Sequence, residues 1–115
     1  MLKGGHMGSR SIVTKYEGIS VISGYPRECR HHLIFGSGKR ELAETDGLWI
    51  PLQNCEHNMA RQRIDQIHEN PMAEYLSKLA GQLAFEKEFY RKKLFSSDQD
   101  PARDAFRTRY GESYL

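Results

Sequence analysis

The alternation of apolar and polar positions divides the first half of the chain into short extended segments. Three short apolar runs, over residues 19–22, 29–35 and 48–52, are bounded by glycine, serine or proline, as is typical of β-strands. Pro51 lies inside the third run and favours a strand end or a sheet edge, because proline has no backbone N–H to donate. We therefore predict a small β-hairpin region here.

Helix-start and helix-stop signals predict two short helices in the same part of the chain. Residues 39–45 have the character of one or two helical turns, which the Asp46–Gly47 pair ends. Asn54 is a suitable N-cap for a helix over residues 55–63, since its side chain can accept a bond from the first free backbone N–H groups.

Two further helices follow. An Asn or Asp N-cap before a proline predicts helix starts at Asn70–Pro71 and at Asp100–Pro101, and Gly111 ends the last helix. Gly81 weakens the middle of the long helix by roughly 1 kcal/mol relative to alanine. We interpret the apolar stripe of the long helix as core packing; it comprises Met72, Leu76, Leu79, Leu83, Tyr90 and Leu94. The expected fold class is α+β, with a short hairpin followed by a long C-terminal helix and a final short helix.

Composition fits a single domain. The 115 residues carry a net charge of +2, and the sequence pI of about 8.6 permits a nucleic-acid partner without requiring one. No run is long and apolar enough for a membrane span, and no signal peptide is evident. Residues 1–9 read as a disordered expression tag, which leaves residues 10–115 as the domain. Two cysteines do not form a disulfide framework, so a reducing cytoplasm is expected.

The residues that carry chemistry are histidines. Outside the expected tag they are His31, His32, His57 and His68. Adjacent side chains on a strand face opposite ways, so the paired imidazoles divide between the two faces of the sheet. Imidazole is a common transition-metal ligand and titrates near neutral pH. A divalent metal with open positions, beside a free imidazole that accepts a proton, is the minimum set for hydrolysing a phosphodiester.

Ordered pieces of the sequence resemble the HNH nucleases, the ββα-metal or His-Me finger group, and in particular small phage-encoded proteins of this kind. The pieces cover nearly the whole expected domain: residues 11–13, 31–36, 39–42, 47–52, 56–58, 68–70 and 106–115. The resemblance implies a ββα-metal unit in an endonuclease that hydrolyses DNA. It also implies a phage or prophage origin and action in the cytoplasm of a bacterial host.

The resemblance also implies a role for each histidine. His31, the first of the pair, matches a metal ligand, and His32 matches the general base that deprotonates water. His57, at the start of the helix after the second strand, matches another metal ligand, and His68 matches a third. One divalent ion, Mg²⁺, Mn²⁺ or Zn²⁺, is implied, with no organic cofactor.

The chain departs from the family pattern in two places. The asparagine that ties the loop between the two strands is absent, and Gly47 stands in its place with Asp46 beside it. The four zinc-ribbon positions of many relatives match poor zinc ligands here: Ser20, Ser23, Gln53 and Glu56. With this zinc site lost, apolar packing by the helices and by Ile19, Val21 and Ile22 would have to supply the missing stability.

A second metal site competes with the histidine site. Cys29 and His31 form a Cys-x-His pair, and Cys55 and His57 form another. Two thiolates and two imidazoles could close a tetrahedral zinc site, which would leave no open position for a substrate.

Basic residues near the histidines are candidates for DNA contact. Lys39 and Arg40 follow a Gly-Ser-Gly turn, and Arg61 and Arg63 belong to the helix expected over residues 55–63. Each could bind a DNA phosphate or form part of a solvated surface. The alternative function is a catalytically inactive HNH-like binding module, a phage regulator or inhibitor that binds DNA or a host or phage protein. The altered ribbon positions and the missing asparagine favour this alternative. The sequence leaves monomer or dimer open.

Overall fold

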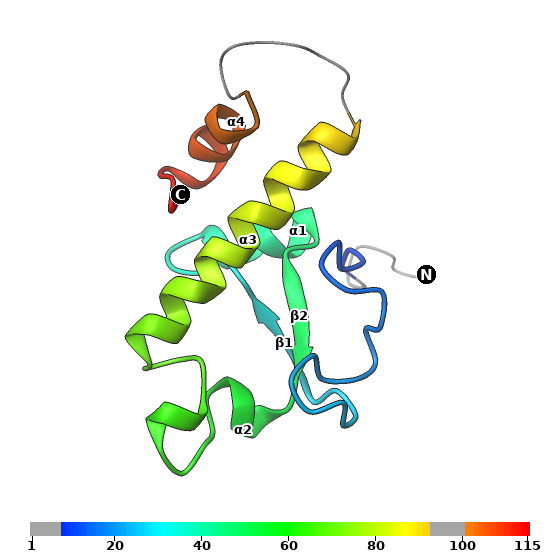
Figure 1. Cartoon of the computed structure of the whole chain (residues 1–115), viewed down its shortest axis with the longest axis vertical. Coiled ribbons are helices and arrows are strands. Elements are labelled where there is room, and N and C mark those ends of the chain that lie inside the picture. Colours follow the sequence, from blue (N-terminus) through cyan, green and yellow to red (C-terminus); the bar gives the residue numbers. More distant parts are fainter. Residues whose placement is uncertain (1–7, 93–100) are drawn as a thin grey trace.

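The computed structural model describes residues 8–92 and 101–115, which form an α+β fold (Figure 1). Residues 1–7 of the expected tag lie outside the described residues. Ser9 is described, and its carbonyl accepts hydrogen bonds from Trp49 Nε1 at 3.1 Å and Arg30 Nη1 at 3.3 Å. The elements in order are β1 (Cys29–His32), α1 (Lys39–Asp46), β2 (Trp49–Leu52), α2 (Asn54–His57), the one-turn 3₁₀ helix η2 (Arg63–Asp65), α3 (Pro71–Lys92) and α4 (Pro101–Tyr110).

The two strands form an antiparallel sheet whose connection contains α1. Cys29 lies opposite Leu52 and His32 opposite Trp49. Pro51 lies opposite Arg30, and in a sheet of two strands every strand is an edge, so the edge position predicted for Pro51 is confirmed. The helix predicted over residues 39–45 is also confirmed.

The strand predicted over residues 19–22 is wrong. Ile19 forms only an isolated bridge with Pro26, and the chain turns at residues 21–23. The cause is the Ser20 hydroxyl, which accepts hydrogen bonds from the backbone N–H groups of Ile22 at 3.0 Å and Ser23 at 3.1 Å. A serine that bonds the backbone two and three residues ahead stabilises a turn in place of an extended strand.

The four positions matched to a zinc ribbon come together as a hydrogen-bonded cluster. One oxygen of Glu56 accepts bonds from the Ser20 hydroxyl at 2.6 Å and from the backbone N–H of Gln53 at 2.8 Å. Burial raises the pKa of Glu56, but the bonds from Ser20, Gln53 and Ser23 outweigh it and hold that pKa below its ordinary value. Hydrogen bonds therefore join these two segments. The expectation of apolar packing there is wrong, because side chains 19, 21 and 22 are exposed.

The loop that lacks the expected asparagine is held by α4. Asp46 accepts bonds from Arg109 Nε at 2.6 Å and from the Tyr110 hydroxyl at 2.7 Å. Gly47 ends α1 with a φ of 75°, and a Cβ there would lie 2.4 Å from the Arg10 carbonyl oxygen. The position therefore requires glycine on both conformational and steric grounds.

The helix predicted over residues 55–63 is mostly absent. Helix α2 ends at His57, where the N–H groups of Asn58 and Met59 both donate to the Asn54 carbonyl. Its N-cap is Gln53, not Asn54. Arg61 and Arg63 therefore do not lie on a helix with His57, contrary to the sequence prediction.

Helix α3 lies across the hairpin (Figure 1) and approaches the end of β1 most closely at Gly81. A Cβ on Gly81 would lie 2.7 Å from Ile34 Cδ1 and 2.9 Å from Leu33 Cβ, so the helix approaches the end of β1 closely only because Gly81 has no side chain. The core packing predicted for the apolar stripe is wrong for Met72, Leu76, Leu83 and Tyr90, which are exposed, and Leu94 lies outside the described residues.

The core lies between the end of β1, the end of α1, α3 and α4. Its fully buried members are Ile34, Ala43, Leu48 and Phe106, with Tyr110 almost as well buried. Phe85 of α3 meets the Phe106 ring edge-on at 5.3 Å between centroids, which joins the two last helices. Among the described helices, none combines the length and hydropathy that a bilayer span needs.

Candidate metal centre

Three histidines from separate elements meet beside the hairpin. His31 lies on β1, His57 is the last residue of α2, and His68 lies in the loop before α3. One ring nitrogen of each lies within 4.8 Å of the others, and the ring centroids are 4.7–5.1 Å apart. These are the three residues predicted as metal ligands.

Backbone pairing places His57 and His68 side by side. The N–H of Ile67 donates to the Glu56 carbonyl, and the N–H of His68 donates to the His57 carbonyl, both at 3.0 Å. The buried side chain of Gln66 supports this arrangement, since it accepts a bond from the Ala60 N–H and donates to the His68 carbonyl. Because α2 ends at His57, the chain can return and place His68, in the loop before α3, beside His57.

The protonation of His31 follows from its partner. The Ser77 hydroxyl donates its single hydrogen to the Leu33 carbonyl at 2.9 Å, so it must accept from His31 Nε2, which lies 2.7 Å away. His31 then carries its proton on Nε2 and a bare lone pair on Nδ1. That Nδ1 is buried and has no hydrogen-bond partner. A buried nitrogen without a partner is costly, and a metal ion would satisfy it.

The other two histidines are equally suited to a metal. Glu74 Oε2 lies 3.2 Å from His68 Nδ1, and a carboxylate accepts the Nδ1 proton and leaves Nε2 free to coordinate. Burial, together with His57, His68 and His32, lowers the pKa of His31 to about 3. Burial, together with His68, His32 and Arg40, lowers the pKa of His57 to about 4. Both imidazoles are therefore neutral at pH 7, which is the form that binds metal.

His32 faces the other way and has a different partner. Its Nε2 lies 2.7 Å from Glu44 Oε1, and the second oxygen of Glu44 accepts from Arg30 Nη1 at 2.6 Å. The Arg30 guanidinium also lies 3.9 Å from the centroid of the Trp49 ring, which is fully buried. Because Glu44 accepts the Nε2 proton, Nδ1 of His32 is left as the basic nitrogen.

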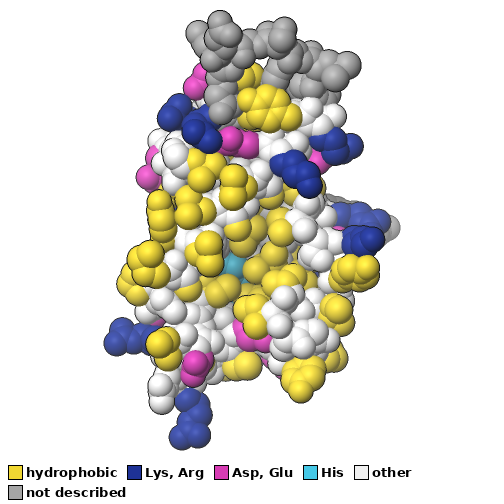
Figure 2. Space-filling model, in the orientation of Figure 1, with side chains coloured by type: hydrophobic (Ala, Val, Ile, Leu, Met, Phe, Trp, Pro, Cys, Tyr) yellow, Lys and Arg dark blue, Asp and Glu magenta, His cyan; other side chains and the backbone are white. Residues whose placement is uncertain are grey.

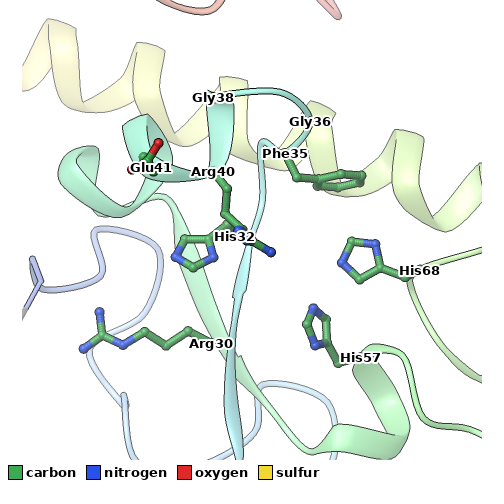
Figure 3. Close-up of a pocket in the computed structure, with 9 residues that line it drawn as sticks. All are labelled: Arg30, His32, Phe35, Gly36, Gly38, Arg40, Glu41, His57 and His68. Carbon is green, nitrogen blue, oxygen red and sulfur yellow. The ribbon is translucent and has the colours of Figure 1, made fainter.

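A pocket of about 620 Å³ is lined by His32 and by two of the three clustered histidines, His57 and His68. Figure 3 shows His57 and His68 on one side of it, with Phe35 nearby, and His32 on the other side between Arg30 and Arg40. The full lining comprises Arg30, His32, Phe35, Gly36, Gly38, Arg40, Glu41, His57 and His68. Three imidazoles, of which two belong to the group that could hold a metal ion, therefore share one open cavity with two guanidinium groups.

Of the four basic residues predicted to bind DNA, only Arg40 lines this pocket. Arg40 is exposed and lines the pocket. Lys39 instead forms an ion pair with Glu112 at 3.0 Å and bonds the Tyr114 hydroxyl. Arg61 and Arg63 are exposed and line no part of this pocket.

The sequence prediction missed four supporting residues: Arg30, Glu44, Glu74 and Ser77. Their only sequence signal is residue type, since each belongs to an ordinary polar helix or strand pattern. Their contacts with the histidines span 6 to 46 positions along the chain or, for Arg30, pass through Glu44.

The competing zinc site with two cysteines does not form. Cys29 Sγ donates to the Leu52 carbonyl at 3.6 Å, and Cys55 is exposed. Within residues 8–92 and 101–115, the group of side chains close enough to share an ion comprises the three histidines and neither cysteine. Three imidazoles leave coordination positions open, as in catalytic sites and unlike closed structural ones.

Comparison of the chain with protein-family models, with curated proteins and with solved structures finds no match. The geometry of the site is therefore the basis for assigning a function.

Proposed function

We propose that this protein is a metal-dependent endonuclease of the HNH type that hydrolyses DNA phosphodiester bonds. The observation that carries the proposal is the division of the histidine pair. His31, whose buried Nδ1 has no hydrogen-bond partner, belongs to one group with His57 and His68, while His32, held by Glu44, lines the pocket that His57 and His68 also line. A group of three histidines that can hold a metal, two of them lining the same cavity as a separate base, provides the parts that phosphodiester hydrolysis needs.

Each residue of the pocket has a role in this reaction. Nδ1 of His32 accepts a proton from a water molecule, whose oxygen attacks the phosphorus as the bond to the leaving oxygen breaks. Glu44 holds the His32 ring in the required tautomer and stabilises the imidazolium that forms. Arg40, exposed at the pocket, binds a phosphate oxygen of the substrate. Arg30 holds Glu44 in place through the 2.6 Å ion pair.

The ligand set favours a transition metal over Mg²⁺. His31, His57 and His68 would hold the ion, and all three offer nitrogen, whereas Mg²⁺ prefers oxygen ligands. When bound, such an ion supplies positive charge that stabilises negative charge on the phosphate and on the leaving oxygen. Zn²⁺ or Ni²⁺ is therefore a better candidate than Mg²⁺ or Mn²⁺, which both favour oxygen ligands.

The hydrogen-bonded cluster at residues 20, 23, 53 and 56 gives separate support to the HNH resemblance. The family resemblance matches these positions to a zinc ribbon, and their hydrogen bonds join the same two segments that a zinc ion would join there. The cluster bears on the fold and does not bear on catalysis.

The test separates metal binding from cleavage. Wild-type protein, His32→Ala and His57→Ala are assayed for nicking of supercoiled plasmid with each metal, with an EDTA control. In parallel, thermal unfolding is measured with and without Zn²⁺, because a ligand at a hundred times its Kd stabilises by about 2.7 kcal/mol. We expect His57→Ala to lose both the metal-induced stabilisation and nicking. His32→Ala should keep the stabilisation and lose nicking.

One result would contradict the nuclease proposal, and another would contradict the role proposed for His32. Metal-induced stabilisation without nicking by any metal would favour the alternative, a binding module of the same fold. Nicking that survives in His32→Ala would show that another group activates the water.

A further inference from the structure

Helix α3 carries an exposed apolar ridge. Met72, Leu76 and Leu83 are 72%, 65% and 56% exposed, and with the half-buried Leu79 they follow the alternating spacing of four and three residues that helix–helix packing uses. Figure 2 shows hydrophobic side chains gathered over the middle of the face on which α3 lies in front. The chain is polar on average, with a mean hydropathy of −0.70, so an exposed apolar ridge of this kind indicates an interaction surface.

An apolar groove of about 410 Å³ runs beside this ridge. Leu76 and the small residues Ala73 and Ala80 of α3 form one wall. The other walls and the floor come from the turn at residues 21–23, from β2, from η2 and from the loop after it; they include Ile22, Ile50, Ile64 and Ile67. Ile22 and Ile64 stand 62% and 77% exposed at the rim.

We propose that this face binds a second copy of the same chain to form a two-fold symmetric dimer. A two-fold interface uses one patch on both copies, so the patch must be complementary to itself. A ridge that lies directly beside a groove meets this condition, because rotation by half a turn places each ridge in the groove of the other copy.

The area of the patch fits a dimer. The exposed parts of Ile22, Ile64, Met72, Leu76 and Leu83 together amount to roughly 600 Å², compared with about 800 Å² that each partner contributes to a standard-size interface. The walls of the groove add to this area once a ridge enters it. The patch is thus of the size that one specific partner covers.

The charges near the groove also favour a second copy. Its lining contains no Lys or Arg and two acidic residues, of which Glu56 is already bonded to Ser20. Asp65 and the exposed Arg63 lie at the two ends of η2, so each copy brings both signs to the rim. A self-complementary rim does not need a strongly charged partner.

Dimer formation would leave the metal pocket open. The pocket and the groove share no lining residue. The groove does reach Ser77, whose hydroxyl accepts a hydrogen bond from Nε2 of His31. The second copy would therefore cover Ser77 from the side of the groove. The pocket lined by His32, His57 and His68 would stay open to a substrate.

The test is the molar mass of the full chain in solution, measured by sedimentation equilibrium over a range of concentrations. We expect the mass to rise from 13.3 kDa toward twice that value. Leu76→Glu and, separately, Ile64→Glu place a charge in the interface and should weaken association by about tenfold or more. Tyr16→Glu is the matched control, since Tyr16 is 62% exposed and lies outside the patch, and it should associate like the wild type.

Circular dichroism checks that each variant keeps its fold, which the exposure of the substituted positions favours. A mass of 13.3 kDa at every concentration would overturn the proposal, and binding of a different apolar partner by that monomer would reassign the surface. Equal association of Leu76→Glu, Ile64→Glu and wild type would overturn it as well. These results are independent of nuclease activity, because the substituted residues, Leu76, Ile64 and Tyr16, do not line the pocket that contains His32.

Discussion

Ser77 of α3 lies 2.7 Å from Nε2 of His31, and this contact determines which nitrogen of His31 is free for a metal. The serine donates to the Leu33 carbonyl and so can only accept from the histidine. A residue 46 positions away from His31 therefore sets the tautomer of a predicted metal ligand.

Removing this contact should weaken metal binding. In Ser77→Ala, His31 can rotate or change tautomer, and we expect the affinity for Zn²⁺ to fall roughly 10- to 100-fold. Competition with a chromophoric chelator measures the affinity. Ser37→Ala, at an exposed serine, is the control. Equal affinities of Ser77→Ala and wild type would show that His31 does not depend on the serine or does not bind the ion.

Glu44 should affect cleavage and not metal binding. Glu44→Gln keeps a hydrogen-bond acceptor for His32 Nε2 but removes the charge that stabilises the imidazolium, so we expect kcat for plasmid nicking to fall by about tenfold or more. Zn²⁺ affinity should stay unchanged. Glu41→Gln is a close control, because Glu41 is an exposed carboxylate in the same helix and lines the same pocket. A comparable loss in both variants would point to the general negative charge of α1.

The stability of the metal-free protein should fall as pH decreases. The pKa of His31 is lowered to about 3 and that of His57 to about 4, whereas in the unfolded chain both lie near 6.5. Below about pH 6.5 the unfolded state binds protons that the folded state does not, so the free energy of unfolding decreases toward acid pH. A fully buried imidazole contributes a slope of at most about 1.4 kcal/mol per pH unit.

Urea unfolding midpoints of the metal-free protein at pH 7, 6 and 5 measure this effect. We expect a progressive decrease, smaller in His57→Asn, which has one titrating group fewer. A midpoint that stays constant across this range would show that the imidazoles of His31 and His57 are more accessible to solvent than the structure has them.

Gly81→Ala should destabilise the protein although alanine is the better helix former. The added Cβ would lie 2.7–2.9 Å from atoms of Ile34 and Leu33, and overpacking of this kind costs about 1–3 kcal/mol, more than the roughly 1 kcal/mol gained in helix propensity. Thermal unfolding compares it with Gly18→Ala, where a Cβ has nothing within 4 Å. A rise in Tm for Gly81→Ala would mean that α3 can move away from β1 at little cost.

Local signals in the sequence were sufficient for several elements. The Asn-Pro start of α3, the glycine that ends α4 and the α1 turn between the strands are confirmed, because capping and turn preferences act over a few residues. The same local reasoning failed at residues 19–22 and 55–63. At residues 19–22 the side chain of Ser20 overrides the apolar pattern, and at residues 55–63 the side chain of Gln66 and the backbone pairing at His68 override the helix-start signal at Asn54.

The histidines that can take part in chemistry could be recognised without coordinates. Adjacent histidines on a strand must face opposite sides, and the family resemblance named His57 and His68 as their partners. The folded chain shows that His31, His57 and His68 lie together. It also shows that Ser77 orients His31 and that Glu44 orients His32. Most of the apolar stripe of α3 faces outward, which the pattern did not indicate. Apolar spacing along a helix indicates that its apolar residues share one face, but it does not indicate which surface packs against that face. Because Gly81 has no side chain, the face of α3 that contains it approaches the end of β1 and is the face that is buried.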